Sequence, residues 1–391
     1  MVTTFSFSKV PEIQFGIGKI ELLSKKAKQF GKKALLVTGK SSFVQSSKGK
    51  WLLKKLESEN IRFELINITS EPSADLIDEI CNKYRQNSFD VIISIGGGSV
   101  MDAGKAISAM LPEAGSVKLF LEGNPLGRPH PGVKIPFIAI PTTAGTGSET
   151  TKNAVLSEVS EKGFKRSLRN ENFIPDIAIV DPELCVTCPP YVTAASGLDA
   201  FTQLFESYIS IHASTMTDAL AYEGMHWIVN SLNKAYKNGN DISARSNMSY
   251  AAMLSGITLT NAGLGTVHGF ASAIGSFFEI PHGIICGSLL GEVNKRNIEK
   301  LQNNKMGNGI LTKYSKIGEL FCNEKNKPEL YYQSALAEAL IKWIEELKIP
   351  KLGKYGLTKD DLEKIISKTD NKNNPVDLNK DDLAGILKKR I

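Results

Sequence analysis

Four residues of types that bind metal ions stand out in the second half of the chain. Asp199 and Gln203 lie four residues apart, and His268 and His282 follow further along the sequence. A helix repeats every 3.6 residues, so Asp199 and Gln203 would project from one face of a helix. A carboxylate, an amide oxygen and two imidazoles can bind one divalent cation if the fold brings them together. The pattern therefore predicts a candidate metal site.

A second group of residues has the composition of a phosphate-binding turn. An apolar run ending at Ile95 is followed by Gly96-Gly97-Gly98-Ser99, and Asp102 comes three residues later. Glycines between a buried strand and a helix let the backbone approach a ligand and present N–H groups at the positive end of the helix. The spacing is not GxGxxG, because Met101 occupies the last glycine position. The turn favours a pyrophosphate, and a glycine-rich turn without a ligand is the alternative.

A loop rich in hydroxyl groups follows another apolar run. Its polar residues after Ile140 are Thr142, Thr143, Thr146 and Ser148, and Gly145 and Gly147 lie among them. Ligands of parallel α/β sheets bind beyond the carboxyl ends of the strands, where this loop and the glycine turn would both lie. The two segments together predict a nucleotide site.

The elements that must position these residues differ between the two halves of the chain. Apolar runs at 33–39, 62–66, 90–95, 135–140 and 177–180 predict buried strands, with helical spacing at 51–56 and 74–84. Helical spacing then predominates, at 194–209, 215–232, 244–260, 267–278, 311–321, 331–347 and 362–368. The expected fold is an α/β domain with a Rossmann-like parallel sheet over residues 1–185, followed by an all-α domain over 186–391.

The composition of the chain argues against several classes of function. The chain has 391 residues, 42% of them hydrophobic, and a net charge of +6 that is spread along its length. No basic run is interleaved with aromatic residues, which argues against nucleic-acid binding. Five scattered cysteines indicate a reducing compartment, and no apolar run reaches the ~18 residues of a membrane span. We expect a cytoplasmic protein without a membrane partner.

The ordered motifs resemble those of the iron-containing (group III) alcohol dehydrogenases, relatives of glycerol dehydrogenase and dehydroquinate synthase. The resemblance covers nearly the whole chain. It is carried by Phe15-Gly16-Ile17-Gly18, Gly96-Gly97-Gly98-Ser99, Pro141-Thr142-Thr143, Gly145-Thr146-Gly147-Ser148-Glu149, Asp181-Pro182-Glu183-Leu184, Gly197-Leu198-Asp199-Ala200 and Pro281-His282-Gly283. It implies a cleft between the two domains that holds a nicotinamide and a metal ion, an aldehyde or primary alcohol as substrate, and a homodimer or larger homo-oligomer.

The resemblance also implies roles for single residues. Gly96, Gly97, Gly98, Ser99 and Asp102 match the pyrophosphate cradle. The residues that surround the nicotinamide in the family are matched by Thr142, Thr143, Thr146 and Ser148, and Lys165 matches a lysine that faces the cofactor. Asp199, His268 and His282 match three of the four metal ligands of the family.

Two departures from the family pattern concern the metal and the proton. Gln203 stands where the fourth ligand is usually His, and Ser272 stands where a proton-transferring His is common. An amide oxygen is a harder and weaker donor than imidazole, so Fe²⁺ would bind less tightly. Three interpretations stay open: a divalent metal at Asp199, His268 and His282, with or without Gln203; zinc or magnesium in place of iron; or no metal, with His268 acting directly as an acid. We place His268 and Ser272 at the catalytic positions.

The residues expected beside the adenosine ribose of the cofactor indicate whether NAD(H) or NADP(H) is preferred. Many NAD-preferring members of the family have Asp at the position of Gly39, and here Gly39 is followed by Lys40 and Ser41. Without that carboxylate nothing repels a 2′-phosphate, and Lys40 with Ser41 could bind it. We therefore expect NADP(H) in preference to NAD(H).

Two rival functions remain on this scaffold. A dehydroquinate-synthase-like lyase or cyclase would consume no NADPH overall, and a nucleotide-binding regulator would have a decayed site. Apolar residues near the ligand positions favour small aldehydes or alcohols over the first rival, and the retained Asp199, His268 and His282 argue against the second. Those apolar residues are Phe201, Leu204, Phe205, Phe270, Phe277 and Phe278.

Overall fold

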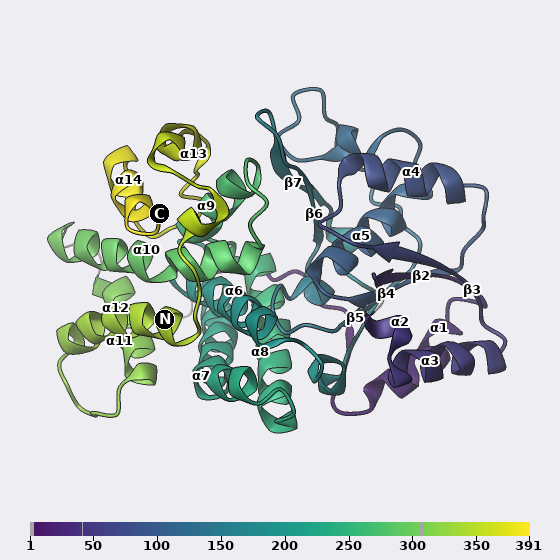
Figure 1. The fold of residues 1–391 in the computed structure, drawn as a ribbon, viewed down its shortest axis with the longest axis horizontal. Helices are drawn as coiled ribbons and strands as arrows, with labels where there is room; N and C mark the ends of the chain where they lie inside the picture. Colours follow the sequence, from purple (N-terminus) through teal and green to yellow (C-terminus); the bar gives the residue numbers. More distant parts are fainter. Residues whose placement is uncertain (1–3, 41, 305–307) are drawn as a thin grey trace.

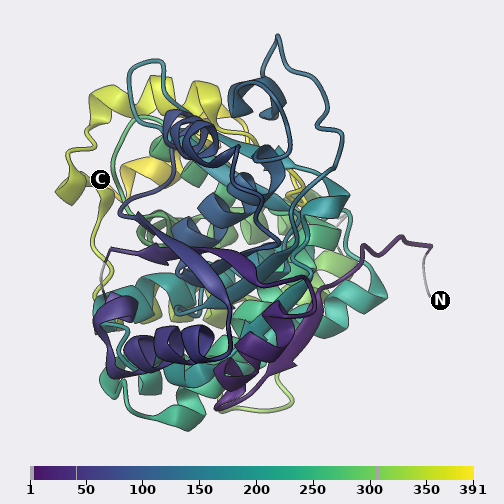
Figure 2. The ribbon, with the colours of Figure 1, turned by 90° about the vertical axis from the view of Figure 1, so that its right-hand side faces the viewer.

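The computed structural model has an N-terminal α/β half and a C-terminal helical half, coloured purple to teal and green to yellow in Figure 1. It describes residues 4–40, 42–304 and 308–391. In Figure 2 the α/β half lies in front of the helical half. Within the described residues, no helix is long and apolar enough to cross a bilayer. The expected fold class is confirmed.

A six-stranded sheet forms the centre of the N-terminal half. All of its neighbouring strands are parallel, in the order β1-β8-β5-β4-β2-β3. The strands are β1 (Glu12–Phe15), β2 (Lys33–Gly39), β3 (Arg62–Ile68), β4 (Val91–Gly96), β5 (Phe137–Pro141) and β8 (Ile177–Val180). The helices of this half are α1 (Leu23–Ala27), α2 (Ser42–Gln45), α3 (Ser47–Ser58), α4 (Ala74–Tyr84) and α5 (Gly98–Met110).

Helices cover both faces of the sheet, which is why its strands are continuous apolar runs. In β2, Leu35 and Val37 pack in one core with side chains of α4 and α5. Ala34 and Leu36 point to the opposite core, which contains side chains of α1 and α3. Because alternate residues of a strand face opposite sides, one apolar run fills two cores.

A two-stranded antiparallel ribbon lies outside this sheet, between the two halves (Figure 1). Its strands are β6 (Asn153–Glu158) and β7 (Phe164–Arg169). β6 contacts α5, and β7 contacts the helical half through α9 (Thr266–Gly275). The ribbon was not predicted from the sequence, because β7 is mostly polar and has no apolar run.

The C-terminal half is helical. Besides α9 it contains α6 (Pro190–Ile209), α7 (Thr215–Lys237), α8 (Ile242–Ala262), α10 (His282–Asn304), α11 (Asn308–Phe321), α12 (Glu329–Glu346), α13 (Leu362–Lys368) and α14 (Lys380–Lys388). α6 is buried along most of its length and contacts α7, α8 and α10. The expected division at 185/186 falls between β8 and α6, and it stays a prediction.

Glycines bring α10 close to α6. A Cβ atom at Gly283 would lie 2.3 Å from the carbonyl oxygen of Ala195, and one at Gly287 would lie 2.8 Å from Leu198 Cδ1. Neither position has room for a side chain, so the backbone of α10 packs directly on α6. Asp199 follows Leu198 on α6, and His282 precedes Gly283 on α10. The close approach therefore brings these two predicted ligands together.

Candidate active site

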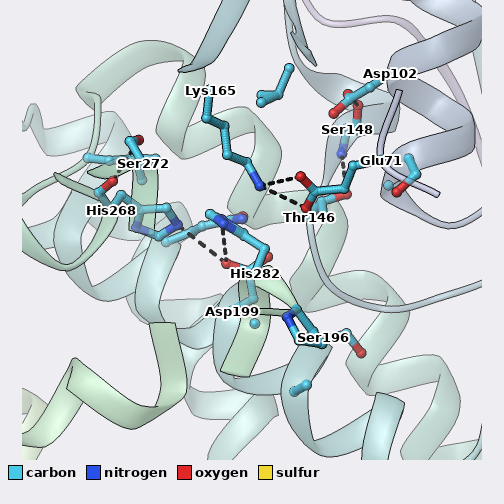
Figure 3. Close-up of a pocket in the computed structure, with 18 of the residues that line it drawn as sticks. Glu71, Asp102, Thr146, Ser148, Lys165, Ser196, Asp199, His268, Ser272 and His282 are labelled. Atoms are coloured by element: carbon cyan, nitrogen blue, oxygen red, sulfur yellow. Dashed lines mark hydrogen bonds and ion pairs between the residues drawn. The ribbon is translucent and has the colours of Figure 1, made fainter. Parts of the chain in front are cut away.

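Asp199, His268 and His282 meet at one point in the structure (Figure 3). They come from α6, α9 and the first residue of α10. Asp199 Oδ1 lies 3.3 Å from His268 Nε2 and 3.7 Å from His282 Nε2. Cys286, one turn after His282, belongs to the same group, whose ligand atoms all lie within 4.8 Å of one another. A carboxylate, two imidazoles and a thiol are suitable ligands for a transition metal or zinc.

The charges of this cluster suit a cation. Burial alone would raise the pKa of Asp199, but the imidazoles of His282 and His268 outweigh it and lower that pKa. Burial lowers the pKa of His282 to about 4, so its ring is neutral at pH 7. Burial would lower the pKa of His268, but Cys286, Glu206 and Asp199 outweigh it and raise that pKa well above 6.5, so this ring would release its proton on binding a metal. Asp199 as a carboxylate and His282 as a neutral imidazole already have the protonation states in which they bind metals.

Glu206 holds the ring of His268 in place. One carboxylate oxygen lies 2.6 Å from His268 Nδ1, and the other accepts a hydrogen bond from the backbone N–H of Val267 at 2.6 Å. Nε2 of His268 is therefore the nitrogen that faces the cluster. A carboxylate behind a ligating imidazole fixes its tautomer and raises its basicity.

Gln203 and Ser272 both line the cleft, and each makes a contact of its own. Gln203 Oε1 accepts a hydrogen bond from Ser255 Oγ at 2.7 Å. Ser272 Oγ donates to the carbonyl oxygen of His268 at 2.9 Å and lies 3.5 Å from Lys372 Nζ. Both expected roles stay predictions.

The glycine turn is located where the sequence predicts it. Gly96 ends β4, and Gly98 begins α5. A Cβ atom at Gly98 would lie 2.6 Å from Thr146 Cγ2, and one at Gly97 would lie 3.4 Å from Thr143 Oγ1. The turn and the hydroxyl-rich loop therefore pack against each other, which suits a ligand that the backbone must approach closely.

A buried network supports these two segments from behind. Ser148 Oγ donates a hydrogen bond to Asp102 Oδ1 at 2.7 Å. Lys105 Nζ donates to the carbonyl oxygens of Ser148 and Asn153 and to Thr151 Oγ1, at 2.7–2.9 Å. Burial lowers the pKa of Lys105 to about 8, with the nearby Asp102 opposing that shift. The ammonium group thus connects α5 to the loop after β5.

The predicted cofactor residues divide into those that line the cleft and those beside it. Gly97, Gly98, Ser99, Asp102, Thr143, Thr146, Ser148 and Lys165 line the cleft. Thr142 lies beside it and donates its backbone N–H to the carbonyl oxygen of Gly96 at 2.9 Å. Gly39 ends β2 at the same edge of the sheet, followed by the exposed Lys40, whereas Ser41 lies outside the described residues.

Lys165 projects into the cleft from β7 (Figure 3). Its Nζ lies 2.7 Å from both carboxylate oxygens of Glu71, which comes from the loop before α4. No strand was predicted around this lysine, but it lies within the ribbon. The ion pair joins β7 to the loop before α4 at the edge of the cleft, close to His282 (Figure 3).

The cleft has a volume of about 1390 Å³. Pockets for a single drug-sized ligand are typically about 300–1,000 Å³, so this one has room for a dinucleotide and a small substrate. It is lined by both the glycine turn and the metal-ligand cluster. Its basic residues are Lys152, Lys165, Arg166, Arg169, Lys348, Lys354 and Lys372.

Comparison with known proteins decides the family. The model described as iron-containing alcohol dehydrogenase matches residues 11–182, and the model for the C-terminal part of the Fe-containing alcohol dehydrogenase family matches 193–391. The chain belongs to the iron-containing alcohol dehydrogenase family. It is an NAD(P)-dependent oxidoreductase that interconverts alcohols and aldehydes, as the sequence analysis expected.

Individual members of the family cover most of the chain. It is 36% identical to the NAD-dependent methanol dehydrogenase of Bacillus methanolicus over 286 aligned residues. The aligned region covers 71% of this chain and 72% of that protein. It is 30% identical over 359 residues to the choline dehydrogenase of Bacillus subtilis, with 90% and 86% covered. A solved structure of 1,3-propanediol oxidoreductase matches with a TM-score of 0.89 and 29% identity over 100% of both chains.

The apolar residues expected around the substrate lie elsewhere in this alcohol dehydrogenase. Phe201, Leu204, Phe205 and Phe270 are fully buried in the helical core, and Phe277 and Phe278 lie beneath Lys364. That expectation was wrong, because side chains on α6 around Asp199 face the neighbouring helices as well as the cleft. Apolar residues that do line the cleft include Val192, Ala195 and Ile284.

Four functional candidates were missed by sequence reasoning. Cys286 belongs to the metal-ligand cluster, Glu206 holds the ring of His268 from behind, and Glu71 and Lys105 support the cofactor side. Helical spacing could have found two of them, because Glu206 lies seven residues after Asp199 and Cys286 lies four after His282. Nothing in the local sequence indicates the contacts of Glu71 and Lys105.

Proposed function

We propose that this alcohol dehydrogenase uses NADP(H) in preference to NAD(H) and acts at a divalent cation held by Asp199, His268 and His282. The observation that carries the proposal is that one cleft is lined both by these three residues and by the Gly97–Ser99 turn. A dinucleotide with its pyrophosphate on the turn would share this cleft with a substrate at the cluster.

The cofactor preference is supported by the end of β2. Gly39 has open space around its Cα, since a Cβ atom placed there would meet no atom within 4 Å. Parallel strands end at the same sheet edge, so Gly39 lies on the side of the glycine turn that follows the adjacent β4. A 2′-phosphate would find no carboxylate at Gly39 and an exposed ammonium group at Lys40.

The metal site is supported by its donor set and by an unpaired buried atom. Asp199 is 2% exposed, and its Oδ1 has no hydrogen-bond partner among the described residues, although His268 Nε2 is at ion-pair distance. A buried carboxylate oxygen without a donor is costly and suggests an unseen partner. A bound divalent cation would polarise the carbonyl oxygen of the substrate. Fe²⁺ and Zn²⁺ are both compatible with carboxylate and imidazole ligands.

The protein residues would each have a defined task in this proposal. Glu206 keeps His268 Nε2 facing the cluster, and Lys165 is held against the cleft by Glu71. Ser272, whose Oγ lies at the cleft beside Lys372, is the candidate for relaying a proton to the product alkoxide. Gln203 lines the cleft one turn from Asp199, where its amide can contact a bound substrate.

The test is aldehyde-dependent oxidation of NADPH by enzyme stripped with a chelator and then restored with Fe²⁺, Zn²⁺ or Mg²⁺. We expect activity to disappear on stripping and to return with one of the metals. Activity that is indifferent to the chelator would replace this proposal with a metal-free reductase in which His268 is the acid. Tight NADPH binding without turnover of a broad aldehyde panel would instead favour a regulator.

We also propose that the protein is a homodimer or larger homo-oligomer located in the cytoplasm. The family resemblance supports the oligomer, and the five scattered cysteines support a reducing compartment. Sedimentation equilibrium of the purified protein tests the oligomeric part. A single species of the 42.6 kDa chain mass would contradict it.

A further inference from the structure

Cys286 lies among the proposed metal ligands, which no sequence motif indicated. It is fully buried on α10, one helical turn after His282. Its Sγ lies 3.7 Å from His268 Nε2 and 3.7 Å from His282 Nε2. The thiol thus faces the same point as the two imidazoles.

Four of the six distances between these atoms match the edges of a tetrahedral site, and all six are within 4.8 Å. With zinc–sulfur bonds of about 2.3 Å and zinc–nitrogen or zinc–oxygen bonds of about 2.0–2.2 Å, tetrahedral angles place sulfur about 3.6 Å from nitrogen and nitrogen about 3.3–3.4 Å from oxygen. The two sulfur–nitrogen distances are 3.7 Å, and the oxygen of Asp199 lies 3.3 and 3.7 Å from the two nitrogens. One cation could contact all four atoms with small adjustments.

A second observation points to a ligand at the same place. Asp199 Oδ1 is the oxygen that faces the two imidazoles, and it is buried without a hydrogen-bond donor among the described residues. Gln203, the expected fourth ligand, has its Oε1 engaged by Ser255 Oγ at 2.7 Å. The cluster therefore contains a thiol and a carboxylate oxygen that accepts no hydrogen bond, while the amide oxygen of Gln203 already accepts one.

We propose that the thiolate of Cys286, and not the amide of Gln203, is the fourth protein ligand, giving the set Asp199, His268, His282 and Cys286. The thiol proton leaves to solvent as the sulfur–metal bond forms. A thiolate is a softer ligand than imidazole or an amide, so this set favours Zn²⁺ or Co²⁺ over hard cations such as Mg²⁺. A substrate oxygen would enter as a fifth ligand from the cleft, since zinc sites can expand to five ligands. The inference rests on the metal site proposed above.

The experiment is a titration of chelator-stripped enzyme with Co²⁺, followed by absorption spectroscopy. Bound Co²⁺ absorbs in the visible region, and a thiolate ligand adds a charge-transfer band in the near ultraviolet. We expect both in the unaltered enzyme. Cys286→Ala should lose the charge-transfer band and bind Co²⁺ at least about tenfold more weakly, whereas Gln203→Ala should retain the band. Cys81→Ala, a buried thiol outside the cleft, is the matched control and should behave as the unaltered enzyme.

X-ray absorption of the zinc-loaded, unaltered enzyme provides a readout that does not depend on any variant folding. We expect one sulfur neighbour at about 2.3 Å from zinc. Visible Co²⁺ bands without the charge-transfer band, or a zinc shell without sulfur, would overturn the role of Cys286 while leaving the proposed metal site intact. Failure to bind either metal would overturn both. Loss of aldehyde reduction with the sulfur neighbour present would contradict only the proposed function.

Discussion

At the scale of single residues, the cleft depends on which atom of each side chain faces the cluster. Asp199 presents Oδ1, and His268 and His282 present Nε2. Glu206 fixes the orientation of the His268 ring, and the packing of α10 on α6 places His282 beside Asp199. Preorganised groups of this kind stabilise charge in a transition state without the cost of rearrangement.

Replacing His268 by Ala tests the cluster directly. We expect turnover to fall by at least about 10²-fold while the affinity for NADPH changes little, because the glycine turn lies on the other half of the molecule. His226→Ala is the matched control, since His226 is exposed on α7. Steady-state kinetics and a fluorescence titration with NADPH make the comparison. Unchanged turnover would remove His268 from the mechanism.

Replacing Glu206 by Gln tests the support behind that imidazole. We expect metal affinity to fall by about 10–100-fold, because the ring nitrogen of His268 loses its carboxylate partner. Competition with a chelator of known affinity measures the change. Glu57→Gln, on the exposed side of α3, should leave the affinity unaltered. Equal affinities in all three proteins would show that Glu206 has a purely structural role.

Replacing Gly39 by Asp tests the cofactor preference. The new side chain has space, but its carboxylate would repel a 2′-phosphate and could accept hydrogen bonds from a 2′-hydroxyl. We expect the ratio of kcat/KM for NADPH to that for NADH to fall by at least about tenfold, which corresponds to about 1.4 kcal/mol. If the unaltered enzyme already binds NADH about tenfold more tightly than NADPH, the proposed preference is wrong.

At the scale of elements, the turn between β4 and α5 is shaped by contact with the loop after β5. Replacing Gly98 by Ala should weaken NADPH binding, because the added Cβ would lie 2.6 Å from Thr146 Cγ2 and push the loop away from the turn. Alanine is the better helix former, so intrinsic helix propensity would act in the opposite direction.

Two further variants isolate the cause. Adding Thr146→Ser to Gly98→Ala removes the methyl group and should restore much of the affinity. Gly385→Ala changes a helical glycine of α14 that has no atom within 4 Å of a new Cβ, and it should have no effect on NADPH binding. Calorimetric titration compares the proteins, and weak binding that the double variant does not rescue would contradict the steric explanation.

At the scale of the whole molecule, the two halves are joined beside a buried carboxyl group. Glu149 lies in the short 3-10 helix η3 (Ser148–Thr150), which packs on α8. A Cβ atom at Gly147 would lie 2.4 Å from the backbone nitrogen of Gly256, so the chain segments are in direct contact there. Burial raises the pKa of Glu149 to about 7 from its ordinary 4.5.

This raised pKa predicts how stability changes with pH. Below about pH 4.5 Glu149 is protonated in both the folded and the unfolded chain, so its burial does not lower the free energy of unfolding. Between about 4.5 and 7 the unfolded chain ionises first, and the contribution of Glu149 to the free energy of unfolding falls as the pH rises. Glu149→Gln should remove the part of this decrease in the free energy of unfolding that Glu149 causes. Denaturant unfolding at several pH values measures it, and parallel curves for the two proteins would contradict the prediction.

The sequence by itself determined the family, the α/β-then-helical order of the chain, and three of the cluster residues. It could do so because a buried parallel strand is a local apolar run, a phosphate-binding turn is a local run of glycines, and Asp199, His268 and His282 lie in motifs that can be recognised one at a time. The expected helix around Asp199 and the strand before Gly96 both appear in the structure.

Only the tertiary structure decided which other side chains join those residues. Helix α10 was not predicted, since Gly283, Gly287 and Gly291 weaken a helical pattern read from the sequence. The structure uses two of them for the close approach of α10 to α6, and this approach brings the thiol of Cys286 within 4.8 Å of the carboxylate of Asp199, 87 positions earlier in the chain. Contacts between segments far apart in sequence depend on packing, and local propensity carries no information about them.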